Sequence, residues 1–319
     1  MPQPTRRDFM KTLAVAGGTL ALGPLPSLGQ ADKILAGTQK PLDLCIARWG
    51  DPDLEAGVMA QAATKLTQQA ISALGGMSRF VGQGDVVWIK PNIGWNKAPE
   101  LAATTNPDVV ATLVKLCFDA GAKTVKVGDN PCNDPKKCYQ NTGIAAAATA
   151  AGAQMVFLDE KRFKKVSLAG QRLIMWDLYP EILEADLVIN VPIAKHHGAS
   201  TVTFCMKNYM GVIGGQRSAW HQDIPACLVD ITRFMKPRLC VLDAVRTLTR
   251  HGPQGGDPAD VAILGTVAAG TDIVALDALG CELMGHKPAD IGTVKAAHDA
   301  GLGRMDFREA LAVAELQVS

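Results

Sequence analysis

The sequence predicts a doubly wound α/β fold with a mainly parallel sheet, helices on both faces and a small β-hairpin insertion. Short apolar, β-branched runs alternate with Ala-rich helical stretches, and runs such as VVWI and LVINV are apolar at nearly every position. Such alternation is typical of parallel strands joined by crossover helices, and strands that are apolar throughout are covered on both faces. We expect a single α/β domain over residues 32–319.

The first half of the chain supplies the clearest elements. Asn106 is a good N-cap, and Pro107 after it suits the first turn of a helix that runs to Ala120. Glycine follows each of the expected helices, as is common at helix ends. The expected strands are 42–47, 85–89, 124–127 and 154–158, and the expected helices are 54–74, 107–120 and 141–151.

The second half begins with an expected hairpin over 166–176, which turns at Ala169-Gly170 within an insertion around residues 160–178. The alternation of strands and helices then resumes, and parallel strands joined in this way have right-handed crossovers. The expected strands are 187–191, 239–242 and 261–268, and the expected helices are 224–234, 273–284 and 291–300.

The N-terminus has the features of an export signal. Two adjacent arginines, Arg6 and Arg7, precede an apolar, Gly-rich stretch over 12–22, and Gly29-Gln30-Ala31 is a small-x-small cleavage site. We therefore expect residues 1–31 to be a twin-arginine signal peptide, the translocation machinery to be a partner, and the mature protein to be periplasmic. The alternative is a basic tail beside a chance apolar run. No other segment is long and apolar enough to span a bilayer.

Composition excludes some classes of function. A net charge of +1 and an aromatic content of 5% give neither the basic surface nor the stacking platforms of nucleic-acid-binding proteins, so we expect no nucleic-acid partner. Six of the eight cysteines lie in apolar runs typical of the core, whereas Cys132 and Cys138 lie in a polar loop. In an oxidising compartment these two could form a disulfide, hold a metal or remain free thiols.

Charged groups follow four of the expected strands. They are Lys90, Asp129, Lys195 and Asp243. Ligands bind beyond the carboxyl ends of parallel strands, so we expect these residues around one cleft. Lysines that are brought together repel one another, and a carboxylate or phosphate ligand would relieve that repulsion. The alternative for each residue is a solvated charge in a loop.

The segment from residue 195 to residue 221, KHHGASTVTFCMKNYMGVIGGQRSAWH, is the richest in reactive side chains. Imidazole can act as an acid, a base or a metal ligand near neutral pH, and lysine can fix an anion. The alternative is a surface loop with paired histidines. No phosphate-binding loop, dinucleotide-binding, HExxH or GxSxG motif is present. The candidate residues here are Lys195, His196, His197, Lys207, Asn208 and His221.

Short motifs spread over residues 42–305 point to one protein family. They are Lys90-Pro91-Asn92, Thr104-Thr105-Asn106-Pro107, Val127-Gly128-Asp129, Lys195-x-His197, Lys207-Asn208 with Gly211, Asp272 with Asp277, and Gly301-Leu302-Gly303. Together they resemble the bacterial and archaeal family called domain of unknown function 362. Some of its members carry iron–sulfur modules, so the resemblance implies a metal ion or iron–sulfur cluster as cofactor, although this chain lacks the C-x₂-C-x₂-C-x₃-C run. The family also looks like the catalytic fold of nickel-pincer lactate racemase, by analogy of fold alone.

Two hypotheses of function follow. The first is an enzyme acting on a small anionic molecule, in which lysines hold the anion and histidine moves a proton. The second is a periplasmic metal-binding or iron–sulfur-associated redox protein without turnover of its own. The catalytic candidates are Lys195, His197, His221 and Asp129; the ligand-binding candidates are Lys90, Asn92, Thr105, Lys207, Asn208 and Asp243; and the metal-binding candidates are Cys132, Cys138 and His196.

Overall fold

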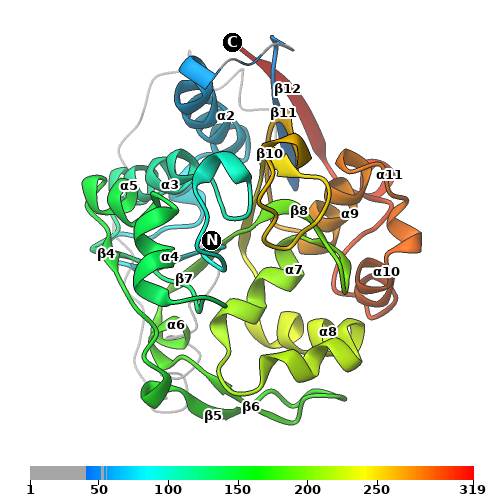
Figure 1. The fold of residues 1–319 in the computed structure, drawn as a ribbon. Coiled ribbons are helices and arrows are strands. Elements are labelled where there is room, and N and C mark those ends of the chain that lie inside the picture. The colour runs from blue at the N-terminus through cyan, green and yellow to red at the C-terminus, as the bar shows by residue number, and fades with distance from the viewer. Residues whose placement is uncertain (1–40, 52–53, 55) are drawn as a thin grey trace, which may run out of the picture.

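A ten-stranded sheet organises the part of the chain that the computed structural model describes, which is residues 41–51, 54 and 56–319 (Figure 1). The strand order along its main path is β12-β1-β11-β10-β7-β2-β3-β4, and β8 and β9 extend it beside β10. The strands of this sheet are β1 (Leu44–Trp49), β2 (Val86–Pro91), β3 (Thr124–Val127), β4 (Gln154–Met155), β7 (Leu187–Val191), β8 (Ile193–His197), β9 (Thr201–Thr203), β10 (Leu239–Leu248), β11 (Val261–Gly270) and β12 (Val313–Val318).

The sheet is mainly parallel, as the sequence predicts. β2, β3, β4, β7 and β10 pair in parallel, and β12 pairs in parallel with β1. Only β11 on the main path runs against its neighbours, β1 and β10. β7 and β8 are two parts of one strand path that is interrupted at Pro192, because both pair in parallel with β10. The predicted α/β fold class is therefore confirmed.

Helices cover both faces of the sheet and bury two apolar cores. Side chains alternate between the cores along β1: Leu44 and Ile46 belong to one, Cys45 and Ala47 to the other. In Figure 1, α3 and α5 lie to the left of the sheet, and α9 and α10 lie to its right. The helices are α2 (Met59–Ala73), α3 (Pro107–Asp119), α4 (Pro135–Asn141), α5 (Ile144–Ala150), α6 (Pro180–Glu184), α7 (Cys205–Asn208), α8 (Ile224–Met235), α9 (Ile273–Leu283), α10 (Gly292–Asp299) and α11 (Phe307–Ala310). Among the described residues, no helix has the length and apolar character needed to cross a bilayer.

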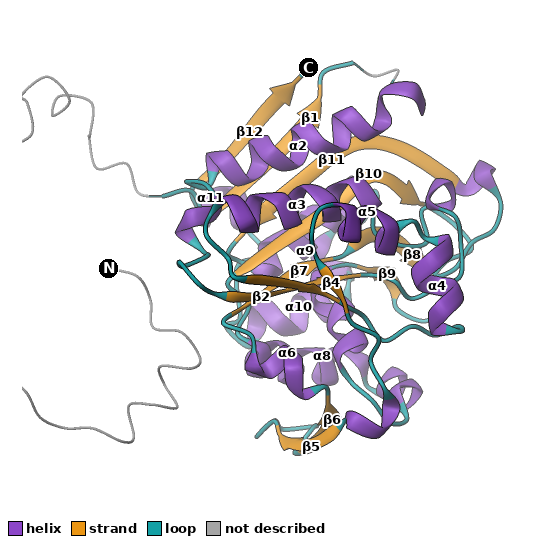
Figure 2. Cartoon of the chain, turned by 90° about the vertical axis from the view of Figure 1, so that its left-hand side faces the viewer, coloured by secondary structure: helices purple, strands orange, loops and turns teal. Residues whose placement is uncertain are grey.

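The predicted hairpin is present as a separate two-stranded sheet of β5 (Lys164–Ser167) and β6 (Met175–Leu178). Its strands pair antiparallel, and its connecting turn is longer than expected: the backbone N–H of Leu168 donates to the carbonyl of Ile174. Figure 2 shows the hairpin at the lower end of the molecule, away from β12.

Several predicted bounds differ from the structure. The helix expected over 141–151 begins only at Ile144, as α5, because Gly143 adopts a left-handed φ of 73° and separates it from the preceding helix α4. The strand expected over 239–242 continues to Leu248, so Asp243 lies inside β10 and not after it. Lys195 likewise lies inside β8, a strand that the sequence did not predict. The expected signal peptide, residues 1–31, lies outside the described residues.

Candidate functional site

A buried ion pair joins the ends of two neighbouring parallel strands. Lys90 is near the end of β2, and Asp129 follows β3 by two residues. The Lys90 ammonium lies 2.7 Å from Oδ1 of Asp129. Gly211 packs directly against the pair: a Cβ there would lie 1.7 Å from Oδ1 of Asp129 and 2.6 Å from Nζ of Lys90. The absence of a side chain at residue 211 therefore permits the pair to form.

Both members of the pair make further hydrogen bonds. Lys90 Nζ donates to the carbonyl of Pro91 at 2.8 Å and to Oδ1 of Asn208 at 3.0 Å. The other carboxylate oxygen of Asp129 accepts the backbone N–H of Ile93 at 2.7 Å. Burial lowers the pKa of Lys90, and the negative charge of Asp129 opposes that effect.

Two asparagines link this pair to a second buried lysine. Asn208 Nδ2 donates to the Lys90 carbonyl at 3.1 Å, and its Oδ1 accepts from Nδ2 of Asn92 at 3.3 Å. Lys195 Nζ in turn donates to Oδ1 of Asn92 at 3.3 Å and to the carbonyl of Ala103 at 2.5 Å. The network brings together side chains that are more than 100 residues apart in the sequence.

Lys195 is buried without a carboxylate partner. Its side chain is almost wholly inaccessible, and no ion pair involves it among the described residues. Burial, followed by repulsion from Lys207, lowers the pKa of Lys195 to about 7. Lys195 is therefore divided between its neutral and charged forms near neutral pH.

Lys207 is the lysine of this group that reaches solvent. It lies in the short helix α7, is half-buried, and its Nζ contacts the Met210 sulfur at 3.6 Å. No described carboxylate forms an ion pair with it. Desolvation lowers the pKa of Lys207 to about 8, and the thiol of Cys132 and the guanidinium of Arg217 are close enough to act on its charge. We call Lys90, Lys195 and Lys207 the lysine cluster.

Two histidines lie beside the lysine cluster. The rings of His197 and His221 stack with their centroids 5.6 Å apart. Burial and then the charge of Lys207 lower the pKa of His197 to about 3, and the same causes lower the pKa of His221. Nδ1 of His197 accepts the backbone N–H of Ala199 at 3.1 Å, so Nε2 carries the proton of the neutral ring. His197 is therefore a neutral hydrogen-bond donor near neutral pH.

Thr105 and Asp243 shape the backbone around the cluster. Thr105 Oγ1 accepts the N–H of Asn92 at 2.8 Å and donates to the Val191 carbonyl at 2.7 Å. Asp243 accepts the N–H of Asn106 at 2.7 Å and of Val245 at 3.1 Å, and burial raises its pKa to about 6. The hydrogen bonds of both side chains are thus made to the polypeptide backbone around the cluster.

Two residues that are not among the predicted site residues position the site. Arg217 donates to the carbonyls of Asn130 at 2.6 Å and Pro131 at 2.7 Å, so it fixes the turn after β3. Asp277 accepts the N–H of Cys205 at 2.7 Å and of Met206 at 3.2 Å, which fixes the start of α7. Arg217 lies in the segment from residue 195 to residue 221, and Asp277 lies in a family motif; these were the available signals.

The candidate metal ligands do not converge. Cys132 is exposed and Cys138 is buried, and both thiols are free in this structure, which agrees with the third of the three alternatives, free thiols. His196 alternates with Lys195 and His197 along β8, and its Nδ1 accepts the N–H of Gly252 at 3.0 Å. Within the described ranges, no three side chains of His, Cys, Asp or Glu are grouped as metal ligands. An iron–sulfur cluster needs about four thiolates, so these residues do not fit one.

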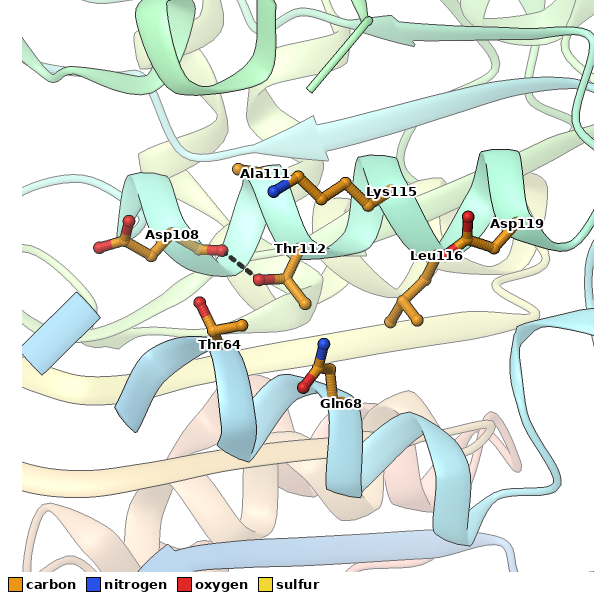
Figure 3. Close-up of a pocket in the computed structure, with 8 residues that line it drawn as sticks. All are labelled: Thr64, Gln68, Asp108, Ala111, Thr112, Lys115, Leu116 and Asp119. Atoms are coloured by element: carbon orange, nitrogen blue, oxygen red, sulfur yellow. Dashed lines mark hydrogen bonds between the residues drawn. The ribbon is translucent and has the colours of Figure 1, made fainter. Parts of the chain in front are cut away.

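A separate groove of about 200 Å³ lies between α2 and α3 (Figure 3). It is lined by residues of both charge signs, among them Asp108, Lys115 and Asp119, and Thr112 Oγ1 bonds to the carbonyl of Asp108. None of the predicted site residues lines it. We therefore place the candidate site at the lysine cluster.

Comparison with known proteins agrees with the motifs. The family model described as domain of unknown function (DUF362) matches residues 87–282. The chain belongs to the DUF362 family. A relative, the thylakoid-associated protein sll1697 of Synechocystis sp., is 32% identical over 241 residues, and the match covers 73% of this chain and 73% of that protein. This DUF362 chain also resembles the lactate racemase apoprotein of Thermoanaerobacterium thermosaccharolyticum, with a TM-score of 0.47 and 10% sequence identity. The match covers 79% of this chain and 58% of the lactate racemase chain.

Proposed function

We propose that this DUF362 protein is an enzyme that binds a small carboxylate or phosphate at the lysine cluster and moves a proton on it. The observation that carries the proposal is an excess of positive charge. Lys90, Lys195, Lys207 and Arg217 surround the site, and Asp129 is the one carboxylate that pairs with any of them among the described residues. An anionic ligand would compensate the remaining charge.

The lysines have different places in this proposal. Lys207 is half-buried, so a ligand arriving from solvent meets its ammonium group first. Lys195 is buried behind it, and a pKa of about 7 suits a group that takes and returns a proton near neutral pH. Lys90 pairs with Asp129 and donates to Oδ1 of Asn208, which fixes that amide in place.

The histidines supply hydrogen bonds in this proposal. His197 is neutral, and its Nε2–H would donate to an anion oxygen beside Lys207. His221 stacks on His197 and lines the same approach from solvent. Proton transfer is thereby assigned to Lys195, and orientation of the anion to the two rings and Lys207.

Thermal unfolding with and without anions tests this function. Acetate, malonate and inorganic phosphate are the probes, and the wild type is compared with Lys207→Gln and Lys115→Gln. We expect at least one anion to raise the Tm of the wild type and of Lys115→Gln, and not of Lys207→Gln. Lys115 lines the groove of Figure 3, so loss of the effect in Lys115→Gln alone would move the site to that groove. No shift in the wild type with any anion contradicts the proposal.

We also propose that the protein is exported by the twin-arginine route. The support is the order of Arg6-Arg7, the apolar stretch over 12–22 and the cleavage site ending at Ala31. Intact-mass measurement of protein from a periplasmic fraction should give a chain that begins at Asp32. Replacement of both arginines by lysine should leave the protein in the cytoplasm, and periplasmic protein that retains Met1 would contradict the proposal.

A further inference from the structure

Thr203, at the end of β9, has a buried hydroxyl group without a hydrogen-bond partner. The residue is only 4% exposed, and no described group donates to its Oγ1 or accepts from it. A buried polar group that bonds to nothing costs stability, so such groups are uncommon in folded proteins. One physical explanation for such a group is a ligand that supplies the missing partner.

The side chain of Thr203 lies on the same face of the sheet as Lys195. The two residues are directly opposite each other in the antiparallel register of β8 and β9. Side chains at opposed positions share a face, with their Cβ atoms about 5 Å apart. Ala194 and Val202, which precede them, pack in an apolar core on the other face, as the alternation along each strand requires. The unpartnered hydroxyl group therefore lies beside the Lys195 side chain.

A second unpartnered hydroxyl group belongs to the loop that contacts Lys195. Thr104 is 1% exposed, and its Oγ1 has no partner among the described residues. It directly follows Ala103, whose carbonyl accepts from Lys195 Nζ at 2.5 Å. The other acceptor of Lys195 is the amide oxygen of Asn92, so both of its partners are neutral. Hydroxyl groups and an amine are thus available around Lys195 for the oxygen of a ligand.

The same face of β8 has an outer level closer to solvent. His197 is two residues beyond Lys195, which is about 7 Å along an extended strand, and it lies opposite Thr201. His197 and Lys207 are both half-buried, and Lys207 is close enough to lower the pKa of His197. The face therefore has an outer level with His197 and Lys207 and an inner level with Lys195 and Thr203.

The strand pair that carries both levels is held in place by the loop after β10. The N–H of Gly252 donates to Nδ1 of His196 at 3.0 Å, and its carbonyl accepts the N–H of Gly198 at 3.1 Å. A Cβ on Gly252 would lie 1.9 Å from the carbonyl oxygen of His196, so only glycine permits this approach. Side chains on an element fixed in this way are well placed to bind a ligand without rearrangement.

We propose that Lys195 and Thr203 bind a second oxygen-bearing group of the ligand whose carboxylate is held by Lys207 and His197. The inference rests on the proposed function and narrows its substrate class to small carboxylates that carry a further carboxylate or a carbonyl group. The Thr203 hydroxyl group donates to that second oxygen and so gains the partner that it lacks in the free protein. A carboxylate without such a group, such as acetate, engages the outer level alone.

Titration calorimetry with acetate and malonate, at constant ionic strength, tests the inference. The wild type is compared with Thr203→Val, which removes the hydroxyl group, and with Thr203→Ser, which keeps it. Thr232→Val is the matched control, because Oγ1 of Thr232 on α8 is likewise buried without a partner. Thermal unfolding of each free protein is the second measurement.

We expect the wild type to bind malonate more tightly than acetate. Thr203→Val should weaken malonate binding about tenfold and leave acetate binding unchanged, because only malonate reaches the inner level. Thr203→Ser and Thr232→Val should keep the preference of the wild type. Without ligand, both valine variants should have a Tm equal to or above that of the wild type, because each removes an unpartnered buried hydroxyl group.

Three results overturn the inference and leave the proposed function standing. They are undiminished malonate binding by Thr203→Val, equal affinity of the wild type for acetate and malonate, and a lower Tm of free Thr203→Val than of free Thr232→Val. The last would mean that the Thr203 hydroxyl group already has a partner in the free protein. If the wild type binds neither of these anions nor phosphate, the proposed function fails, and the inference fails with it.

Discussion

The ammonium nitrogen of Lys90 lies 2.7 Å from Oδ1 of Asp129, and the two side chains are only 1% and 3% exposed. Removing one partner of such a pair leaves an uncompensated buried charge, whereas removing both does not. Asp129→Asn should therefore lower the free energy of unfolding by about 3–5 kcal/mol. The double variant Lys90→Met/Asp129→Asn should lose less than the sum of the single losses.

Chemical denaturation of the wild type, both single variants and the double variant measures this coupling. Additive losses within about 0.5 kcal/mol would mean that the two groups do not interact, contrary to the geometry.

Gly211 allows the ion pair to form, so Gly211→Ala should disrupt it. The added methyl would overlap Oδ1 of Asp129 and approach Nζ of Lys90, which forces a shift in a fully packed region. We expect a loss of about 1–3 kcal/mol in stability together with weaker anion binding. Gly57→Ala is the matched control, because a Cβ at residue 57 meets nothing within 4 Å. Equal behaviour of the two variants would show that residue 211 is not in contact with the pair.

Lys195→Met should separate stability from function. Burial lowers the pKa of Lys195 from 10.5 to about 7, so the folded state binds fewer protons here than the unfolded state. The charged lysine therefore penalises folding fully below pH about 7, and the penalty disappears as the pH rises towards about 10. Methionine removes the penalty, although the Ala103 carbonyl loses its donor.

The free energy of unfolding of Lys195→Met, relative to the wild type, should accordingly decrease as the pH rises from about 7 to about 10. Urea unfolding across this range measures it. A difference that is constant with pH would show that Lys195 titrates normally in the folded protein.

Asp277 should act on the site through α7. Burial raises the pKa of Asp277 from 3.8 to about 7. In the folded protein the carboxyl group therefore keeps its proton until the pH rises through about 7. The stability that it contributes is complete below about pH 4 and decreases up to about pH 7, by about 4 kcal/mol at most. Asp277→Asn cannot ionise, so its stability relative to the wild type should increase over that window.

Circular dichroism melts of the two proteins at several pH values test this expectation, with Asp272→Asn as a second capping aspartate on the same helix. If the wild type and Asp277→Asn keep a constant difference, the carboxyl group is not neutral in the folded state.

Much of the fold follows from local patterns. Strands β3 and β7 have the predicted bounds because their apolar, β-branched runs are buried in the sheet. The sequence Lys195-His196-His197 has no such pattern: β8 forms because it pairs with Thr203 on one side and Leu248 on the other. Strand formation there is decided by tertiary contacts, which a single sequence does not display.

The candidate site, like the fold, could be predicted from the sequence only where it depends on local strand patterns. Lys90 and Asp129 meet because β2 and β3 are parallel neighbours, as the strand pattern predicts. The role of Arg217 depends on carbonyls 86 and 87 residues earlier in the chain, which no local pattern indicates. The lowered pKa of His197 also depends on tertiary structure, because burial and the charge of Lys207 cause it.

The uptake of protons on anion binding tests the central claim most directly. A bound anion would raise the pKa values of Lys195 and Lys207, which are about 7 and about 8 in the free protein. Near pH 8 the protein should therefore take up protons when it binds malonate, which is itself fully ionised there, and its affinity should fall as the pH rises. Titration calorimetry in two buffers of different ionisation enthalpy measures this uptake. Net uptake in the wild type that is reduced in Lys207→Gln is the predicted result; malonate binding without uptake, or no binding of any of the three probe anions, would contradict it.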